Sequence, residues 1–575
     1  MKKTGVFFLL GAVLLFVTAA CGGGGGSASP TTEGTVTYPL LSKSVKNEAA
    51  FIPSQCYTVT EGENGEKFNP CYSCHKNSVE PNYTNDDDLQ ETYTFAEYAN
   101  TNHWTNLFVD RTEAVVAQSD SEILSYVRQD NYKSSDGKII LAEKLKSVPK
   151  EWDFDGDGSW GGYTPDCYFN FDSEGFDKNP SGGYTGWRAY AYAPFLGTFW
   201  PTNGSTDDVL IRLSDIFMKD EGGSFSLDVY KINLAIVESL IKKKDIAIDP
   251  VDETVYGVDL DKNGSLGTAS VIEYDWLPTA GRYMYYVGLA KTKLAAGEVH
   301  LAAGLFPEGT EFLHSVRYIN VTDGGDIDIA PRMKELRYSK KLMWMTYSDL
   351  EYEAYDEFKE EYDFPDRLSV YYGDIEYGLS NPQGWVFQAF IEDAKGDLRP
   401  QTYEETVFCM GCHTRLGATS DTVFTYSRKY EDSSNKRGWF HWTQKSIKGM
   451  PEHKVAYEGK GDQYEYTMYL QQNIAGDEFR DNDEVKAKFF NADGTLKTDM
   501  VNALHSDVSV LLFPSSARAL TLNKAYRTIV KEQSFVYGRD ANVKPVTNVH
   551  KTISPQDKPT GLTDFILSTA TSLIF

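Results

Sequence analysis

The stretch CYSCH at residues 71–75 places two cysteines and a histidine at the spacing C-x-x-C-H. A second stretch, CMGCH at residues 409–413, repeats this spacing far along the chain. The spacing suits attachment of a c-type haem, and its two cysteines also suit a redox dithiol or half of a zinc site. The rest of the fold must enclose whatever these two pentapeptides hold.

The repeat decides between these interpretations. Seven cysteines and nine histidines in 575 residues give on the order of 0.001 chance matches to C-x-x-C-H. A zinc site made from both pairs would have four thiolates, but it does not explain why a histidine follows the second cysteine both times. A thioredoxin-like dithiol needs a βαβ context and one active pair, and the flanks show neither. Haem attachment is the favoured interpretation.

The N-terminus, MKKTGVFFLLGAVLLFVTAAC, has the pattern of an export signal. Two lysines precede an apolar run over residues 5–17, which is short for a membrane span, and small residues at 18–20 precede Cys21. This arrangement resembles the signal of bacterial lipoproteins, in which the cysteine is acylated and becomes the first mature residue. We therefore predict a signal peptide over 1–20 and attachment to the membrane through a lipid on Cys21. An ordinary cleaved signal with a chance cysteine is the alternative.

Residues 21–41 form a Gly/Ser-rich tether that cannot build a core. Gly22, where an aspartate could stand, resembles outer-membrane sorting, so we expect a cell-envelope protein anchored to the outer membrane, either periplasmic or surface-exposed. No other stretch approaches about 18 consecutive apolar residues, so no further membrane span is predicted. The net charge of −27 repels phosphate, so nucleic acid is not an expected ligand, and basic partners are favoured.

Two cysteines, Cys56 and Cys167, remain after the anchor and the two C-x-x-C pairs are set aside. In an exported protein such a pair can form a disulfide, and we predict one here. Two buried free thiols are the alternative.

With two C-x-x-C-H motifs behind an export signal, the chain resembles the dihaem c-type cytochromes. The resemblance covers only these motifs and the leader. It implies two covalently bound haem c groups, each joined by two thioethers and ligated at iron by the histidine of its motif. The residues so assigned are Cys71, Cys74 and His75 for one haem, and Cys409, Cys412 and His413 for the other.

The sixth ligands are less well marked. His441 lies in GWFHWTQK, among aromatic residues that can cover a porphyrin, and we predict it for the second haem; an aromatic-packed core histidine is the alternative. His314 precedes an alternating strand pattern and is predicted for the first haem, with His300 and His103 as rivals. The thioethers of Met343, Met345 and Met450 are further candidates, although methionine more often fills a core.

The chain divides into a first haem module over 42–150, a central region over 151–400 and a second haem module over 401–575. Helix-like and strand-like runs mix without βαβ alternation, which predicts an α+β fold with two mainly helical or irregular haem-binding parts around a mixed centre. Helices are expected at 119–129, with Ser119 or Ser121 as the cap, at 226–244, with Leu234, Val237 and Ile241 on one apolar face, and from Pro331 to residue 358. Strands are expected at 208–213, 253–258 and 282–289.

Two acidic loops fit the D-x-[DN]-x-[DN]-G opening of a calcium loop, in which oxygens at alternate positions converge on the cation. Neither loop has the glutamate of an EF-hand at position 12, and Asp166 or Glu273 could substitute. We predict possible calcium sites here, with acidic solvated turns as the alternative. The predicted ligands are Asp153, Asp155 and Asp157 in the first loop, and Asp259, Asp261 and Asn263 in the second.

Two classes of function are open. The first is electron transfer by an envelope-anchored dihaem cytochrome c that docks redox partner proteins. The alternative is a haem-dependent oxidoreductase, peroxidase-like or a small-molecule reductase, with one haem whose coordination is open. Dihaem peroxidases are shorter and have closer motifs, and carrier function alone does not explain the long haem-free centre. The group opposite His75 separates a carrier from an enzyme.

Overall fold

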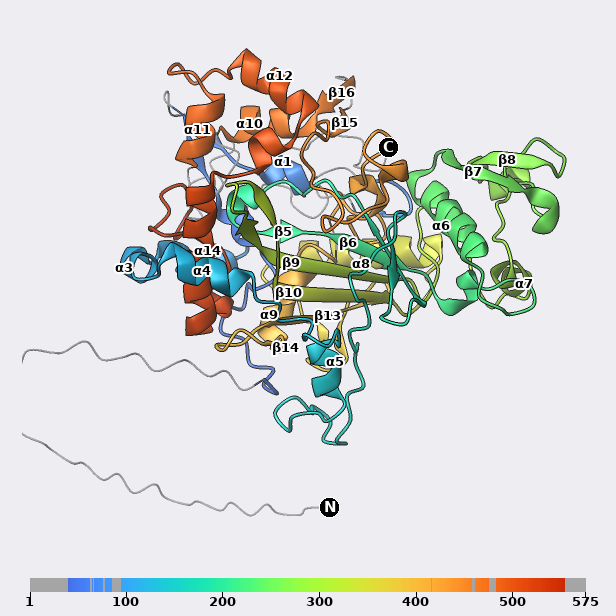
Figure 1. Ribbon diagram of the computed structural model, residues 1–575, viewed down its shortest axis with the longest axis horizontal. Coiled ribbons are helices and arrows are strands. Elements are labelled where there is room, and N and C mark those ends of the chain that lie inside the picture. Colours follow the sequence, from blue (N-terminus) through green and yellow to red (C-terminus); the bar gives the residue numbers. More distant parts are fainter. Residues whose placement is uncertain are drawn as a thin grey trace, which may run out of the picture. The chain divides into compact units, whose positions relative to one another are not determined.

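Two long antiparallel strands, β9 (Glu311–Val321) and β10 (Ile327–Lys341), form the hairpin at the centre of the fold (Figure 1). Their connection needs a left-handed residue, which Gly325 supplies at a φ of +87°. β10 pairs with β9 on one side and with β13 (Trp385–Glu392) on the other, so its backbone is satisfied along most of its length. The hairpin is the frame from which the candidate site is built.

The computed structural model describes residues 40–62, 65, 67–75, 78–84, 95–414, 416–457, 461–474 and 482–553. The predicted signal peptide, Cys21, Gly22 and nearly all of the tether lie outside these residues. Among the residues that are described, no helix is long and apolar enough to cross a membrane. The residues described from position 40 onward belong to one compact unit by their contacts, and the division predicted for 42–150, 151–400 and 401–575 stays a prediction.

The central sheet is antiparallel throughout and runs in the order β11-β12-β13-β10-β9-β6-β4-β3, with β14 beside β13 and β5 beside β9. The other strands of this sheet are β3 (Phe176–Lys178), β4 (Tyr184–Tyr190), β5 (Thr206–Asp207), β6 (Val209–Arg212), β11 (Tyr372–Asp374), β12 (Gly378–Ser380) and β14 (Leu398–Pro400). In the part of the chain that the structure describes, small two-stranded sheets outside this one are β1 (Thr60–Glu61) with β2 (Lys67–Phe68), β7 (Ile246–Asp252) with β8 (Thr268–Ile272), and β15 (Lys454–Tyr457) with β16 (Gly461–Tyr464).

Helices surround this sheet, and α4 and α14 contact β9 directly (Figure 1). The described helices are α1 (Cys71–Cys74), α3 (Thr112–Val116), α4 (Asp120–Val127), α5 (Ile140–Leu145), α6 (Leu227–Lys242), α7 (Leu289–Ala295), α8 (Tyr347–Asp363), α9 (Tyr403–Met410), α10 (Glu465–Asn473), α11 (Asp483–Phe489), α12 (Thr498–Ser506), α13 (Ser509–Leu512) and α14 (Ser516–Glu532). Helices and antiparallel strands in one unit confirm the α+β prediction.

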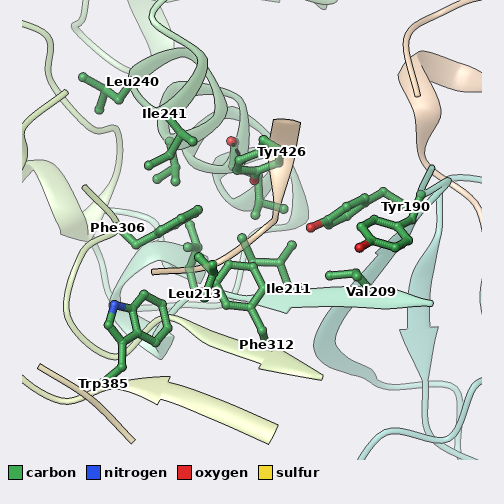
Figure 2. Packing of buried hydrophobic residues seen from close by; sticks show 14 of the residues in the cluster. Tyr190, Val209, Ile211, Leu213, Leu240, Ile241, Phe306, Phe312, Trp385 and Tyr426 are labelled. Atoms are coloured by element: carbon green, nitrogen blue, oxygen red, sulfur yellow. Dashed lines mark hydrogen bonds between the residues drawn. The ribbon is translucent and has the colours of Figure 1, made fainter. Parts of the chain in front are cut away.

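The largest core cluster lies between α6 and the sheet. Figure 2 shows Ile241 of α6 above Phe306, with Ile211 of β6 lower in the view, and Leu240 and Tyr426 belong to the same cluster. These side chains are 1 % exposed or less, so each withdraws nearly all of its apolar surface from water. The same cluster includes Val209 and Phe312, which also line the cavity described below, so the core directly supports the site.

Two of the three predicted helices are confirmed. Ser119 caps α4 through a capping box with Glu122, and α6 begins after its cap Ser226 and buries the predicted apolar face. The helix predicted from Pro331 is wrong in its first part, which is strand β10, and right in its last part, where α8 begins at Tyr347. Pairing on both edges favoured the strand over the local helix propensity of its Lys, Glu and Leu residues.

The strand predictions had mixed outcomes. The run at 208–213 contains β6, whereas 253–258 begins with a single 3-10 turn at Glu253–Val255 and 282–289 forms no strand. Both failed runs are rich in aromatic or branched residues but lie near the loop of Asp259 and Asp261. Glu253 there accepts backbone hydrogen bonds from Leu260 and Gly267, which closes a loop in place of a strand.

Candidate functional site

The two C-x-x-C-H motifs line the same cavity, which has a volume of about 1230 Å³. Its walls come from the whole length of the chain: residues 51–56, the hairpin β9–β10, and the stretch from α8 through 364–372. Six motif residues line it, namely Cys71, Cys74, His75, Cys409, Cys412 and His413. The central region, which carries no motif, therefore forms the wall that brings two distant motifs together.

Both motifs fold into the same local turn. α1 consists of Cys71–Cys74, and the backbone N–H of His75 donates to the carbonyl of Cys71 at 2.9 Å. At the second motif, α9 ends at Met410 and the N–H of His413 donates to the carbonyl of Cys409 at 3.2 Å. Each histidine thus leaves its helical turn one residue after the second cysteine.

The second motif rests on the segment that begins at Phe51. A Cβ added to Gly411 would lie 1.6 Å from the carbonyl oxygen of Phe51, so only glycine fits at this contact. Gly411 has an ordinary helical φ of −60°, which means that close approach and not backbone conformation requires the glycine.

Cys56 lines the same cavity. Burial raises the pKa of its thiol, and the neighbouring thiols of Cys71 and Cys412 raise this pKa further. Cys167 lies elsewhere, in the core cluster of Tyr132 and Trp187, and is fully buried. Both thiols are free, so the predicted Cys56–Cys167 disulfide is wrong. The two cysteines pack in separate parts of the unit, which a count of leftover cysteines cannot reveal.

The thiols of the motifs do not have the properties of a redox dithiol. Burial raises the pKa of Cys71 and of Cys412 to about 12, and it also raises the pKa of Cys409. Reactive cysteines need the opposite shift, toward the thiolate. Among the described residues, no group of three metal-ligand atoms within 4.8 Å includes a cysteine, so the four motif sulfurs do not converge as a zinc site requires.

The motif imidazoles are held neutral, which is the form that ligates a metal. Burial lowers the pKa of His75 and of His413 to about 4. The Nδ1–H of His413 donates to the carbonyl of Thr422 at 2.9 Å, which leaves Nε2 as the nitrogen with a lone pair. Thr422 is itself fixed, because its neighbour Asp421 forms a fully buried ion pair with Lys341.

His314 is the third histidine that lines the cavity. It sits on β9, its ring lies 6.0 Å from that of Phe199, and its Nε2 is buried without a hydrogen-bond partner. Burial first, and then the neighbouring Arg337 cation, lower its pKa to about 4, and His413 contributes in the same direction. His314 is therefore within electrostatic range of the second motif, although the sequence prediction assigned it to the first.

His441 does not line the cavity, so the cavity gives no support to its predicted role as an axial ligand, which stays a prediction. Its Nε2–H donates to Asp208 at 2.6 Å, and its Nδ1 accepts from the backbone N–H of Thr443 at 3.1 Å. It packs on the rings of Phe169 and Phe171, which is the core-histidine alternative. The rivals also lie elsewhere: His103, His300, Met343, Met345 and Met450 are not among the residues around the cavity.

Charged residues on β10 form part of the wall and were missed because β10 was read as a helix. Arg337 stacks on Phe199 with its guanidinium carbon 4.3 Å from the ring centre and pairs with Glu335, which also binds Arg539 at 2.8 Å. Lys334 donates to Gly204 and Ser205 from a buried position. The alternation in residues 327–341 was the available signal, since it places Glu335 and Arg337 on one face of a strand.

Both acidic loops gather their carboxylates. Asp153, Asp155 and Asp157 bring oxygens within 4.8 Å of one another, and Asp259 and Asp261 do so together with Glu253. Asp166 instead pairs with Arg212, and the backbone N–H of Glu273 pairs with Leu260, so neither predicted substitute joins a cluster. Glu253 was missed because it precedes its loop. Calcium binding stays a prediction.

The cavity fits the cofactor that the motifs imply. Pockets for drug-sized ligands measure about 300–1000 Å³, so about 1230 Å³ exceeds what one such ligand needs. The donor set fits as well: two thiol pairs, two neutral imidazoles with their backbone turns, and the unpartnered Nε2 of His314. Arg337, Arg539 and Lys334 also line the cavity and would offer cations to the carboxylates of a porphyrin.

Comparison with known proteins finds similarity to lipoproteins. A family model whose description reads ":-like lipoprotein" matches residues 40–503. The chain is also similar to a protein of Aquifex aeolicus (strain VF5) named "Uncharacterized lipoprotein", with 31% identity over 557 residues that cover 87% of each chain. No solved structure matches.

Proposed function

We propose that this chain, which belongs to the lipoprotein family whose model it matches, is a dihaem c-type cytochrome that transfers electrons at the cell envelope. One observation carries the proposal: two C-x-x-C-H motifs from distant parts of the sequence line a single cavity of about 1230 Å³. Two separate redox dithiols would not require both motifs to line the same cavity.

The chain's own residues would hold the cofactors in defined ways. Cys71 and Cys74 would bind one haem beside His75, and Cys409 and Cys412 the other beside His413. A bound haem supplies a one-electron iron couple. The carbonyl of Thr422 orients the His413 ring, and the buried walls keep both imidazoles neutral. Strands β9 and β10 of the central sheet form one wall of the space that the motifs share.

We assign His314 to the second haem, whose iron it would ligate together with His413. Its buried Nε2 has no partner, and it responds electrostatically to His413. Two axial imidazoles generally give a lower potential than a histidine with a methionine. Together with the burial of the site, this arrangement suits a centre that exchanges electrons without binding substrate.

Lipoprotein membership supports attachment to a membrane, with Cys21 as the acylated residue. Placement at the outer membrane is a finer proposal, and it rests on Gly22 after that cysteine.

The number of histidines around the cavity favours a second function, that of a haem-dependent oxidoreductase. All nine histidines fall within the described residues, and three of them line the cavity: His75, His314 and His413. Two haems have four axial positions, so imidazoles can fill three. An open position opposite His75 would make that haem a site for a small ligand, as in a haem-dependent oxidoreductase.

Spectroscopy of the haem-loaded protein distinguishes the two functions. A carrier predicts two low-spin haems in both redox states, with no change on addition of CO to the reduced protein. An oxidoreductase predicts one low-spin and one high-spin haem, the latter shifting with CO. Protein with no covalent haem would contradict both.

A further inference from the structure

Helix α8 and the segment after it form the rim where the cavity meets solvent. Residues that line the cavity here include Tyr362, Val370 and Tyr372, whose exposed fractions are 83%, 67% and 79%. Such exposed lining contrasts with the buried Phe312 and Val209 at the inner wall. A molecule that approaches the cofactors from solvent would therefore meet α8 and residues 364–372 first.

The helix itself is strongly acidic. Its 17 residues carry a single cation, Lys359, which pairs with Asp363. Eight acidic residues accompany it: Asp349, Glu351, Glu353, Asp356, Glu357, Glu360, Glu361 and Asp363. A concentration of one charge sign beside an opening focuses the field there and raises the encounter rate with oppositely charged molecules.

Exposed tyrosines lie within this acidic surface. Tyr352, Tyr355 and Tyr362 are 62%, 63% and 83% exposed. At about 100° per residue they fall within roughly 80° of arc on the helix, on the side away from buried Leu350 and Ala354. Tyrosine is enriched at protein interfaces, because its ring buries apolar area there while its hydroxyl group still finds a hydrogen-bond partner.

We propose that the outer face of α8, with residues 364–372, is the docking surface for a basic electron-transfer protein, a proposal that rests on the proposed function. The tyrosine stripe would provide the contact and the flanking carboxylates the steering. A helix of 17 residues is about 25 Å long, which suits the small interfaces of transient redox encounters, below about 1200 Å². The docked partner would sit over the rim, where exposed residues line the cavity.

Electron transfer from the reduced, haem-loaded protein to two probe proteins tests this surface. The probes are a lysine-rich cytochrome c and an acidic blue-copper protein of similar reduction potential, each added in its oxidised form in a stopped-flow instrument at ionic strengths from low to high. We expect the rate with the basic probe to exceed that with the acidic one at low salt and to fall at least tenfold as salt screens the charges.

Matched variants locate the effect. The triple variant Glu351→Gln, Glu353→Gln, Asp356→Asn leaves the cavity lining intact and should slow the basic probe about tenfold at low salt. The control Glu113→Gln, Glu151→Gln, Asp432→Asn removes the same charge from positions outside the cavity and should change the rate less than twofold.

The haem spectrum and reduction by dithionite first show that each variant carries its cofactors. If they are normal, equal slowing in both variants, or a rate that does not depend on salt, would overturn the docking proposal. Absence of covalent haem would instead overturn the proposed function, and it is read from the spectrum before any probe is added. The two failures are therefore distinguishable.

Discussion

His314 of β9 and Arg337 of β10 are paired directly across the central hairpin, and both line the cavity shared by the two C-x-x-C-H motifs. The pairing places an imidazole with a free buried nitrogen beside a guanidinium that stacks on Phe199. His314 could ligate iron and Arg337 could bind a propionate. The backbone hydrogen bonds between β9 and β10 hold both residues in place.

Replacement of His314 tests its assignment as the sixth ligand of the second haem. His314→Ala should convert one of the two haems from low spin to high spin and allow CO to bind it after reduction, because no other histidine near that motif is available. His441→Gln is the matched control and should keep the wild-type spin state, since both nitrogens of His441 bind protein groups. A change of spin state in the control alone would reverse the assignment.

Gly411→Ala should destabilise the fold by about 1–3 kcal/mol or more, because the new Cβ would overlap the Phe51 carbonyl. Urea unfolding of both proteins measures the loss. Gly267→Ala is the control, as nothing lies within 4 Å of its added Cβ and its φ is not in the left-handed region. Equal stabilities for Gly411→Ala and the wild type would show that residues 51–53 do not rest on the second motif.

Glu392 gives a prediction for pH. Burial raises the pKa of this carboxyl to about 7 from an ordinary 4.5, although Tyr318, Tyr126 and Arg332 hydrogen-bond to it. The folded state then binds the proton more tightly than the unfolded state, so wild-type stability falls as pH rises from about 4.5 to 7. Glu392→Gln does not titrate.

The stability of Glu392→Gln relative to the wild type should therefore increase through this range, by roughly 3 kcal/mol in total, and level off above pH 7. Chemical unfolding at a series of pH values measures it. A relative stability that falls as pH rises, or that is flat, would contradict a raised pKa.

Calcium should raise the unfolding temperature if the loop of Asp259 and Asp261 binds it with Glu253. Removal of calcium with EGTA should lower the temperature again, and magnesium should not replace it. Glu253→Gln should remove much of the response, whereas the exposed Glu298→Gln should keep it. An unfolding temperature that ignores calcium in the wild type would leave the loops as solvated turns.

How much the sequence could predict differs between local and long-range features. The α+β class, the cap at Ser119 and the apolar face of α6 follow from local pattern, and all are confirmed. β10 was misread because its pairing partners, not its own propensity, decide its structure. The convergence of the motifs could not be predicted, since it depends on the tertiary arrangement of the intervening hairpin.

The same distinction explains the ligand assignments. His441 has the aromatic neighbours expected around a haem, yet Asp208, which is remote in sequence, occupies its Nε2. The cysteines of the motifs were identified by spacing alone, but the free state of Cys56 and Cys167 depends on two separate packing environments. The spacing of cysteines and histidines predicts the chemistry of one motif, whereas the contacts between motifs and remote residues are known only from the fold.

Covalent haem content tests the central claim most directly. The full-length protein, expressed with a c-type maturation system and extracted with acid–acetone, should retain two haems per chain by pyridine haemochrome assay. The paired variants Cys71→Ala with Cys74→Ala, and Cys409→Ala with Cys412→Ala, should each retain one. Loss of all haem from the wild type on extraction would contradict the account.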